Sequence, residues 1–315
     1  MLMQLDVFGK TKLDCTIDRI KAFEPKSGEG YYLCFSGGKD SQCIYHLAKM
    51  AGVKFDAHYN LTSVDPPELF YFIRDNYPDV QIEIPHDKDG NRVSMWSLIA
   101  QNTIPPTRNA RYCCEELKET GGKGRVTMTG VRWAESPNRK ANQGAVTIIG
   151  KSKKTQKTLT EIGASFTQTG KGGVVLNTDN DEARRAVELC YRTRKTLVNP
   201  IIDWDDSEVW EFLNEIAKVP HCRLYDEGFT RLGCIGCPMS GARGMKRDFA
   251  RWPKYEALYI RAMEKMIENH PGQIRIATGE IARGGSRCSR LGGSGVPSVA
   301  EMAQLVMDWW TADWH

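Results

Sequence analysis

Short apolar runs alternate with amphipathic segments along the first part of the chain, and this alternation predicts the fold class. Each apolar run has the length of one buried strand, whereas the segments between the runs carry apolar residues at helical spacing. Such alternation is typical of a parallel sheet covered by helices. We therefore expect an α/β fold, a parallel twisted sheet with helices on both faces. The predicted strands are Tyr31–Phe35, Val53–Asn60, Val80–Ile84 and Arg125–Gly130, and the helices between them are Asp40–Met50 and Glu68–Asn76.

The later part of the chain is predicted to be mainly helical. The segment 206–217 places Val209, Trp210 and Leu213 on one helical face. Ser298 and Glu301 form a capping-box pattern, which predicts the start of a last helix rich in tryptophan. The glycine-rich stretch 283–297 is instead predicted to be a loop. Two further helices are predicted over Asp179–Lys195 and Pro253–Asn269.

These patterns divide the chain into an N-terminal segment, residues 1–30, an α/β domain, residues 31–220, and a helical, cysteine-containing region, residues 221–315. Within the α/β domain, residues 140–173 are rich in Lys, Thr, Gly and Gln. We expect an inserted, partly exposed excursion there, in the form of a hairpin. Its lysines make it a candidate contact for an acceptor or a partner, nucleic acid included, and a solvated loop is the alternative. These lysines are Lys151, Lys153, Lys154 and Lys157.

The overall composition limits the classes of protein that the sequence can encode. The chain is 41% hydrophobic and 26% charged, which is ordinary for a globular protein. A formal net charge of +4 permits an anionic ligand but does not by itself indicate nucleic-acid binding. No apolar run is long enough to span a membrane and the N-terminus lacks a signal-peptide pattern, so we expect a cytoplasmic protein with no membrane partner. Ten cysteines in a reducing compartment then indicate metal, cluster or thiol chemistry.

The stretch Ser36–Ser41, which reads SGGKDS, follows the first predicted strand and opens a helix. Small residues at such a turn let backbone N–H groups converge at the helix N-terminus, where phosphate binds. Lys39 supplies a positive charge for phosphate, and Asp40 would hold the loop or a magnesium ion. The spacing differs from a Walker A loop. A tight turn without a ligand is the alternative interpretation. The predicted phosphate site consists of Ser36, Gly37, Gly38, Lys39, Asp40 and Ser41.

The SGGKDS string resembles the PP-loop of the N-type ATP pyrophosphatases, which cleave ATP between its α- and β-phosphates. Further segments, in order along residues 31–238, resemble the phosphoadenosine phosphosulfate reductase-like branch of that superfamily. They are VDPPE from Val64, TGVRWAESPNR from Thr129, VNPIIDWDDSEVWEFL from Val198 and LYDEGFTRLGCIGCP from Leu224. The resemblance implies an adenine nucleotide alpha hydrolase-like fold that uses ATP and Mg²⁺.

The resemblance also implies roles for charged residues outside the loop. Arg132, Glu135 and Arg139 lie in the region that binds the phosphate or sulfate end of the nucleotide. Asp65 and Glu68 follow a predicted strand end, where open α/β sheets place ligands. We therefore expect all five side chains at the nucleotide site. A surface ion-pair cluster is the alternative for the arginines.

The cysteines carry a second pattern. Cys113 and Cys114 are adjacent, and Cys234 and Cys237 form a CxxC pair, which alone could be a redox pair or half of a zinc site. Together, CC followed by CxxC resembles the ligand pattern of the 4Fe–4S cluster in iron–sulfur adenylylsulfate reductases. That resemblance implies a cluster on these four residues. Lys118 could face the cluster or another anion.

Two departures from the reductases bear on the predicted activity. Their phosphate loop is usually degenerate, whereas this one is intact, and the chain lacks their C-terminal ECGLH motif. Cys288, in RCSR, is the cysteine that lies downstream of the CxxC pair. We expect it to be a sulfur carrier or nucleophile, in a loop that closes over the nucleotide; an incidental loop cysteine is the alternative.

These departures favour the ATP-using relatives. The leading hypothesis is an ATP pyrophosphatase with a 4Fe–4S cluster that adenylylates a substrate for sulfur transfer, as in DNA phosphorothioation enzymes. Lys39, Asp40 and Cys288 are its predicted catalytic residues. A sulfur donor such as a cysteine desulfurase and a homo-oligomeric state are expected. The alternatives are a thiol-dependent phosphoadenylyl-sulfate or adenylyl-sulfate reductase and a non-catalytic nucleotide-binding regulator.

Overall fold

The computed structural model of the chain describes residues 2–26, 28–149, 153–170, 173–177, 187, 195–271 and 298–312. It divides into two compact units, each built from several stretches of the chain. Unit 1 consists of residues 1–59, 67–83 and 121–232, and unit 2 consists of residues 60–66, 84–120 and 233–315. The predicted helix over 179–195, apart from Val187 and Lys195, and the glycine-rich loop 283–297 lie outside the described residues.

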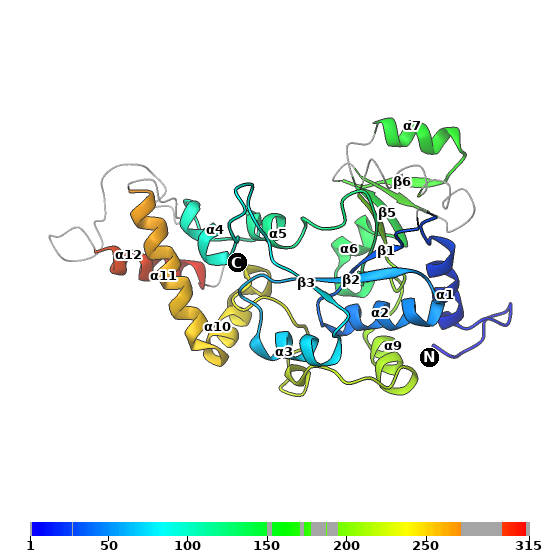
Figure 1. Ribbon diagram of the computed structural model, residues 1–315, viewed down its shortest axis with the longest axis horizontal. Coiled ribbons are helices and arrows are strands. Elements are labelled where there is room, and N and C mark those ends of the chain that lie inside the picture. Colours follow the sequence, from blue (N-terminus) through cyan, green and yellow to red (C-terminus); the bar gives the residue numbers. More distant parts are fainter. Residues whose placement is uncertain are drawn as a thin grey trace. The chain divides into compact units, whose positions relative to one another are not determined.

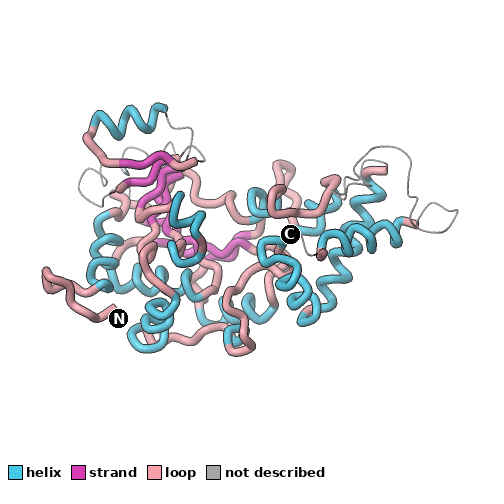
Figure 2. Tube along the Cα trace, turned by 180° about the vertical axis from the view of Figure 1, so that it is seen from behind, coloured by secondary structure: helices cyan, strands magenta, loops and turns pink. Residues whose placement is uncertain are grey.

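Unit 1 is built on a mostly parallel sheet of eight strands, which Figures 1 and 2 show as one continuous group of arrows and magenta segments. Their order is β3-β2-β1-β4-β8-β5-β7-β6. Strands β2, β1, β4 and β8 pair in parallel, and β5, β7 and β6 add antiparallel pairs beyond β8. The predicted α/β class is confirmed. The strands are β1 Tyr31–Cys34, β2 Phe55–Asn60, β3 Gln81–Glu83, β4 Val126–Met128, β5 Val146–Ile149, β6 Phe166–Gln168, β7 Val174–Leu176 and β8 Lys195–Val198.

The helices of unit 1 follow the predicted ones closely where both are described. Helix α2 packs against α1 and α9, and its apolar face is fully buried. The predicted helix 206–217 is α9 followed by one π-helical turn, Phe212–Ile216, and Val209 and Leu213 are buried as expected. The helices are α1 Lys12–Ala22, α2 Lys39–Ala51, α3 Pro67–Asn76, α6 Pro137–Asn142, α7 Lys153–Glu161 and α9 Asp206–Glu211, with short 3-10 turns at Trp133–Glu135 and Arg223–Tyr225.

The segment 140–173 differs from its prediction. The expected hairpin is present as β6 and β7, but the same segment and its continuation also supply β5 and α7, and β5 pairs directly with β8. Val146, Ile148 and Val174 are almost fully buried. The segment is therefore the antiparallel edge of the sheet rather than an exposed excursion, because three short strands satisfy one another and the parallel sheet.

Unit 2 is helical. Helix α11 packs against α4, α10 and α12, and the indole Nε1 of Trp310 donates a hydrogen bond to the carbonyl of Pro106 at 2.6 Å. The predicted capping box at Ser298 and Glu301 is confirmed, with both reciprocal hydrogen bonds formed. The helices of this unit are α4 Met95–Gln101, α5 Tyr112–Leu117, α10 Gly241–Arg251, α11 Pro253–Asn269 and α12 Val299–Trp310, with a 3-10 turn at Pro238–Ser240. Among the described residues, no helix has the length and apolar character needed to cross a membrane.

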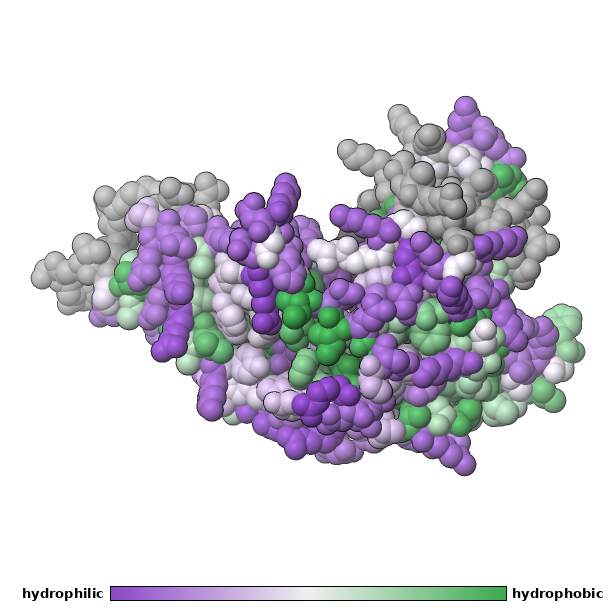
Figure 3. Space-filling view, in the orientation of Figure 1, coloured by the Kyte–Doolittle hydropathy of each residue, from purple (hydrophilic) through white to green (hydrophobic). Residues whose placement is uncertain are grey.

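The N-terminal segment precedes α1 with a tight turn in which the amide of Asp6 donates to the carbonyl of Lys10 at 2.8 Å. This turn exposes apolar side chains, visible in Figure 3 as green surface at the end of the molecule that carries the N-terminus in Figure 1. Val7 and Phe8 are 93% and 86% exposed. Thr11 then caps α1 through a full capping box with Asp14.

Candidate functional site

The SGGKDS segment is a strand–turn–helix junction, as the sequence predicts. Strand β1 ends at Cys34 and α2 begins at Lys39. Gly37 has a φ of +70°, and a Cβ atom there would meet the Ile73 side chain at 2.7 Å. Only glycine therefore fits at this position, for conformation and for space. The turn brings the loop against α3 and leaves the N-terminus of α2 at the carboxyl edge of the sheet, where ligands bind in open α/β folds.

The two serine hydroxyls of the loop are engaged with the loop itself. The amide and the hydroxyl of Ser36 both donate to the Oγ of Ser41, at 3.1 and 3.2 Å, and that hydroxyl donates to the carbonyl of Gly38 at 2.9 Å. The first backbone amide of α2, that of Lys39, donates to the Oη of Tyr225 at 2.8 Å. Burial raises the pKa of this phenol, so it stays neutral. An incoming phosphate oxygen would therefore meet polar groups that are already ordered.

The ammonium group of Lys39 is nearly buried but weakly paired. The residue is 5% exposed, and its Nζ lies 3.6 Å from an oxygen of Asp40, 3.5 Å from one of Asp206 and 3.5 Å from the carbonyl of Thr230. These contacts are long for charge-assisted hydrogen bonds, which are usually shorter than 3 Å. The cation is thus held at the helix N-terminus with capacity for a stronger anionic ligand such as phosphate.

Arg132 fixes the loop from below. It is 1% exposed; its Nε donates to Asp40 at 2.7 Å, its Nη2 to Asp206 at 2.5 Å and its Nη1 to the carbonyl of Trp204 at 3.2 Å. Burial opposes ionisation of Asp206, but the hydrogen bond from Arg132 and the charge of Lys39 lower its pKa overall. Arg132 is therefore a positioning residue, and Asp40 holds the loop through it.

Gly130 brings strand β4 into direct contact with the loop. A Cβ atom at this position would lie 2.8 Å from the carbonyl oxygen of Asp40. No side chain is tolerated there without moving the start of α2. The TGVR segment therefore serves the phosphate loop through a glycine as well as through Arg132.

Glu135 collects the remaining arginines of this region. One oxygen accepts hydrogen bonds from the amide of Arg132 and from the guanidinium of Arg139, and the other lies 3.5 Å from Arg231. Glu68, expected nearby, pairs with Arg223 at 3.3 Å. Two guanidinium groups around one carboxylate leave a net positive charge, which suits a polyanionic ligand.

Asp65 lies in unit 2, beside the cysteines rather than among the loop residues. Its carboxylate accepts the amide of Thr62 at 2.7 Å and interacts electrostatically with Lys118 and Cys234. Cys288, expected to be catalytic, lies outside the described residues, as does the loop expected to close over the nucleotide.

The four cysteines expected to bind a cluster all lie in unit 2. Cys113 and Cys114 start helix α5, and Cys113 interacts electrostatically with Cys114, Cys234 and Cys237. The thiols are therefore gathered, although the described part of the chain has no group of three or more Cys, His, Asp or Glu side chains arranged around a single metal ion. In a 4Fe–4S cluster each iron takes its own thiolate, so the sulfurs do not converge on one point.

Two cations accompany the thiols. The Nη2 of Arg111 lies 3.4 Å from the Sγ of Cys114, and the hydrogen bond from Cys113 and the charge of Arg111 lower the pKa of Cys114. The thiol of Cys234 raises the pKa of Lys118, and Lys118 also donates a hydrogen bond to it. A positive surround of this kind favours thiolate ligands and an anionic centre.

A comparison with known families identifies the chain. The model of the phosphoadenosine phosphosulfate reductase domain matches residues 30–240. The chain belongs to the phosphoadenosine phosphosulfate reductase domain family. The matched residues include the phosphate loop, Arg132 and all four cysteines, so the features described above lie within the family domain. This membership confirms the coarser part of the predicted resemblance.

Individual relatives are distant. An uncharacterized protein of Methanocaldococcus jannaschii is 25% identical over 238 residues, 74% of this chain and 42% of the relative. A second one from that organism is 25% identical over 274 residues, 80% of this chain and 53% of the relative. The chain thus spans about half the length of these proteins. The adenosine 5'-phosphosulfate reductase of Allochromatium vinosum is 33% identical over 55 residues, 18% of this chain and 21% of the reductase.

Solved structures with a similar arrangement are also distant. The FMN adenylyltransferase of Candida glabrata matches with a TM-score of 0.40 and 15% identity, over 71% of this chain and 60% of that one. The phosphoadenylyl-sulfate reductase of Candida auris matches with a TM-score of 0.39 and 14% identity, over 74% of this chain and 98% of that one.

Sequence reasoning missed three contributors to the site: Tyr225, Asp206 and Gly130. Tyr225 lies in the LYDEGF segment and Asp206 in the DWDDSE segment, so both stood in quoted motifs without an assigned role. Their contacts with Lys39 and Arg132 join residues that are more than 70 positions apart. Only the folded chain brings them together.

Proposed function

We propose that the chain is a PP-loop ATP pyrophosphatase that adenylylates an acceptor oxygen and thereby supports sulfur transfer. The observation that carries this proposal is the weakly paired, nearly buried Lys39 ammonium at the N-terminus of α2, within an intact SGGKDS turn. It is an arrangement built to receive phosphate rather than to pair internally.

The reaction forms one bond and breaks one. The acceptor oxygen attacks the α-phosphorus of ATP in line, and the bond from that phosphorus to the bridging oxygen of the β-phosphate breaks, so that pyrophosphate leaves. Lys39 and the first amides of α2 stabilise the negative charge on the departing phosphates. The attached AMP then makes the acceptor oxygen a good leaving group for a sulfur nucleophile.

Mg²⁺ would be held by the phosphates of ATP together with one or two carboxylates. Asp40 and Asp206 are the candidates, because each places a carboxylate oxygen within 3.6 Å of the Lys39 ammonium. The ion would neutralise phosphate charge when bound. Arg132 orients both carboxylates, and Arg139 with Arg231 adds positive charge near the nucleotide.

The cysteine group of unit 2 would hold a 4Fe–4S cluster. Four thiols, an accompanying Arg111 and an accompanying Lys118 match the donors and the charge balance of an anionic thiolate cluster. When bound, the cluster would supply an electrostatic or redox centre. Cys113, Cys114, Cys234 and Cys237 would be its ligands.

Incubation of the anaerobically purified chain with α-labelled ATP and Mg²⁺ tests the activity. We expect AMP, free or attached to an acceptor, and pyrophosphate. Lys39→Ala and Asp40→Asn should reduce this turnover at least tenfold, whereas Lys157→Ala, at an exposed position on α7, should not. Wild-type turnover by both loop variants would place the nucleotide site elsewhere.

The two alternative functions give different products. A thiol-dependent reductase would release sulfite from adenylyl-sulfate or phosphoadenylyl-sulfate and leave ATP intact. A nucleotide-binding regulator would bind ATP and form neither pyrophosphate nor sulfite. The sulfur donor, a role for Cys288 as sulfur carrier, and a homo-oligomeric state remain predictions from the sequence.

A further inference from the structure

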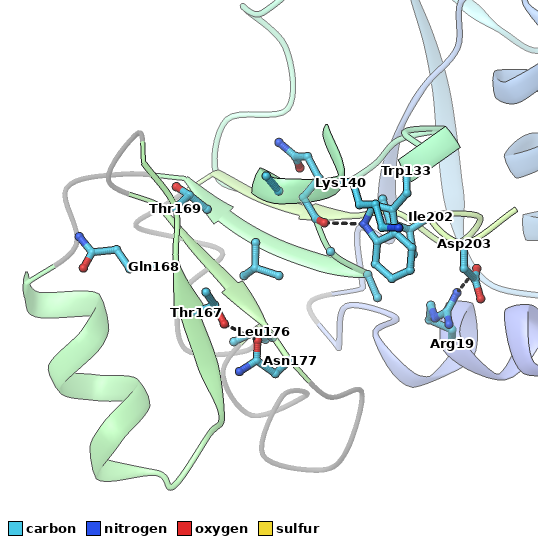
Figure 4. A pocket seen from close by; sticks show the side chains of 15 residues that line it. Arg19, Trp133, Lys140, Thr167, Gln168, Thr169, Leu176, Asn177, Ile202 and Asp203 are labelled. Carbon is cyan, nitrogen blue, oxygen red and sulfur yellow. Dashed lines mark hydrogen bonds and ion pairs between the residues drawn. The ribbon is translucent and has the colours of Figure 1, made fainter. Parts of the chain in front are cut away.

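A pocket on unit 1 has no part in the proposed nucleotide chemistry. It has a volume of about 450 Å³ and lies between the β6–β7 hairpin and the segment that joins α6 to β5 (Figure 4). Trp133, Arg19 and Asp203 form its other side. This volume is in the range of pockets that bind small organic ligands.

Trp133 gives the pocket an ordered aromatic surface. Its indole Nε1 donates to the carbonyl of Gln143 at 2.7 Å, which fixes the edge of the ring, while the residue stays 37% exposed. A large aromatic side chain that is held at its edge and open at its face is suited to stacking against a planar ligand.

Gln143 gives the pocket one unmet hydrogen-bonding need. Its side-chain Oε1 is buried and has no hydrogen-bond partner among the described residues. A buried carbonyl oxygen without a donor is costly, so a ligand or an ordered water is expected to supply an N–H or O–H group. The neighbouring polar side chains are already paired: Thr167 donates to Asn177 at 2.8 Å, and Arg19 contacts Asp203 at 3.3 Å.

We propose that this pocket binds a nucleobase with an exocyclic amino group. The base would stack on Trp133, and its amino group would donate to the Oε1 of Gln143. Lys140, an exposed cation at the rim, would contact the phosphate of the same nucleotide. Stacking on an aromatic side chain and one hydrogen bond at a base edge are the usual means of holding an unpaired base.

The wall of the pocket is continuous with the support of the phosphate loop. The amide of Trp133 donates to the carbonyl of Ile202 at 2.8 Å, and the adjacent Arg132 binds Asp40 and the carbonyl of Trp204. A base bound on Trp133 is therefore one residue away from the side chain that positions the loop. The proposal itself concerns binding and does not depend on ATP turnover.

Binding of cytosine and thymine probes by the full chain tests the proposal. Cytosine carries the exocyclic amino group and thymine does not, and neither is an adenine that would also enter the nucleotide site. We expect a fluorescently labelled oligo-dC to bind at least fivefold more tightly than oligo-dT in an anisotropy titration. Free dCMP and dTMP, measured by calorimetry, distinguish a free nucleotide from a base within a strand, and cytosine preference in either form supports the site.

Variants then assign the binding to the pocket. Trp133→Leu and Gln143→Met should each weaken cytosine binding at least fivefold, and Trp133→Phe should weaken it less because a ring remains. Gln81→Met, an exposed glutamine on β3, is the matched control and should change nothing. If Trp133→Leu fails to fold, Gln143→Met still decides. Equal binding of cytosine and thymine, or cytosine binding unchanged by Gln143→Met, overturns the proposal, whatever the outcome of the ATP assay.

Discussion

At the scale of single residues, the site depends on buried charge that is fully coordinated by its surroundings. Arg132 is the clearest case, since its guanidinium is almost inaccessible and binds two carboxylates and one carbonyl. Family resemblance implied that this residue binds the nucleotide. Its contacts instead make it the support of Asp40 and Asp206, which in turn surround Lys39.

Arg132→Met should therefore lower the free energy of unfolding by about 3 kcal/mol, because removing one partner leaves buried charge uncompensated. Urea denaturation measures this loss. ATP turnover should fall as well, since Asp40 loses its orientation. Arg223→Met is a suitable control because the Arg223 side chain is 68% exposed and pairs with Glu68; its effect should stay within about 1 kcal/mol. Equal effects of the two substitutions would contradict the assigned role.

At the scale of secondary-structure elements, the loop is shaped by close backbone approaches. Gly37 lets the turn pass over α3, and Gly130 lets the end of β4 touch the start of α2. These approaches set where the amide groups at the N-terminus of α2 lie. The geometry of the phosphate site is thus determined by neighbouring elements as much as by the loop.

Gly130→Ala should displace the start of α2, because its Cβ would meet the Asp40 carbonyl at 2.8 Å, well inside van der Waals contact. We expect ATP turnover to fall at least tenfold. A smaller loss of thermal stability is expected, since the sheet itself is untouched. Gly170→Ala is the matched control: the nearest atom to its Cβ would be 3.9 Å away. Turnover unaffected by Gly130→Ala would show that the loop tolerates the shift.

At the scale of the whole molecule, two sets of functional residues belong to different units. The phosphate loop with Arg132 lies in unit 1, and the cysteines with Lys118 lie in unit 2. Each set is held by contacts within its own unit. Loss of one set should therefore leave the other intact.

Iron and sulfide content should report this separation. The anaerobically purified chain is expected to hold about four irons per chain, and Cys113→Ser or Cys234→Ser should remove most of them. Lys39→Ala should retain the iron while losing ATP turnover. Cys222→Ser, at a buried cysteine of unit 1, is the control and should keep its iron. Stoichiometric zinc without sulfide in the wild-type chain would contradict the cluster.

The sequence by itself determined the α/β class, the positions of most described elements and the strand–turn–helix setting of the phosphate loop. These features depend on local patterns, namely apolar runs, helical spacing, glycine and the capping boxes. The same patterns failed at residues 140–173, because short strands are stabilised by their partners rather than by their own composition. β5 is a strand because it pairs with β8, nearly fifty positions away.

Only the tertiary structure decided how the charged residues are used. Sequence motifs placed Arg132, Glu68 and Asp65 in one predicted site, but Arg132 supports the loop, Glu68 pairs with Arg223 and Asp65 lies with Lys118 and Cys234. The contacts of Tyr225, the steric role of Gly130 and the unpaired oxygen of Gln143 likewise have no local signature. Hydrogen bonds and van der Waals contacts between distant residues exist only after folding, and a residue type in a motif does not specify its partner.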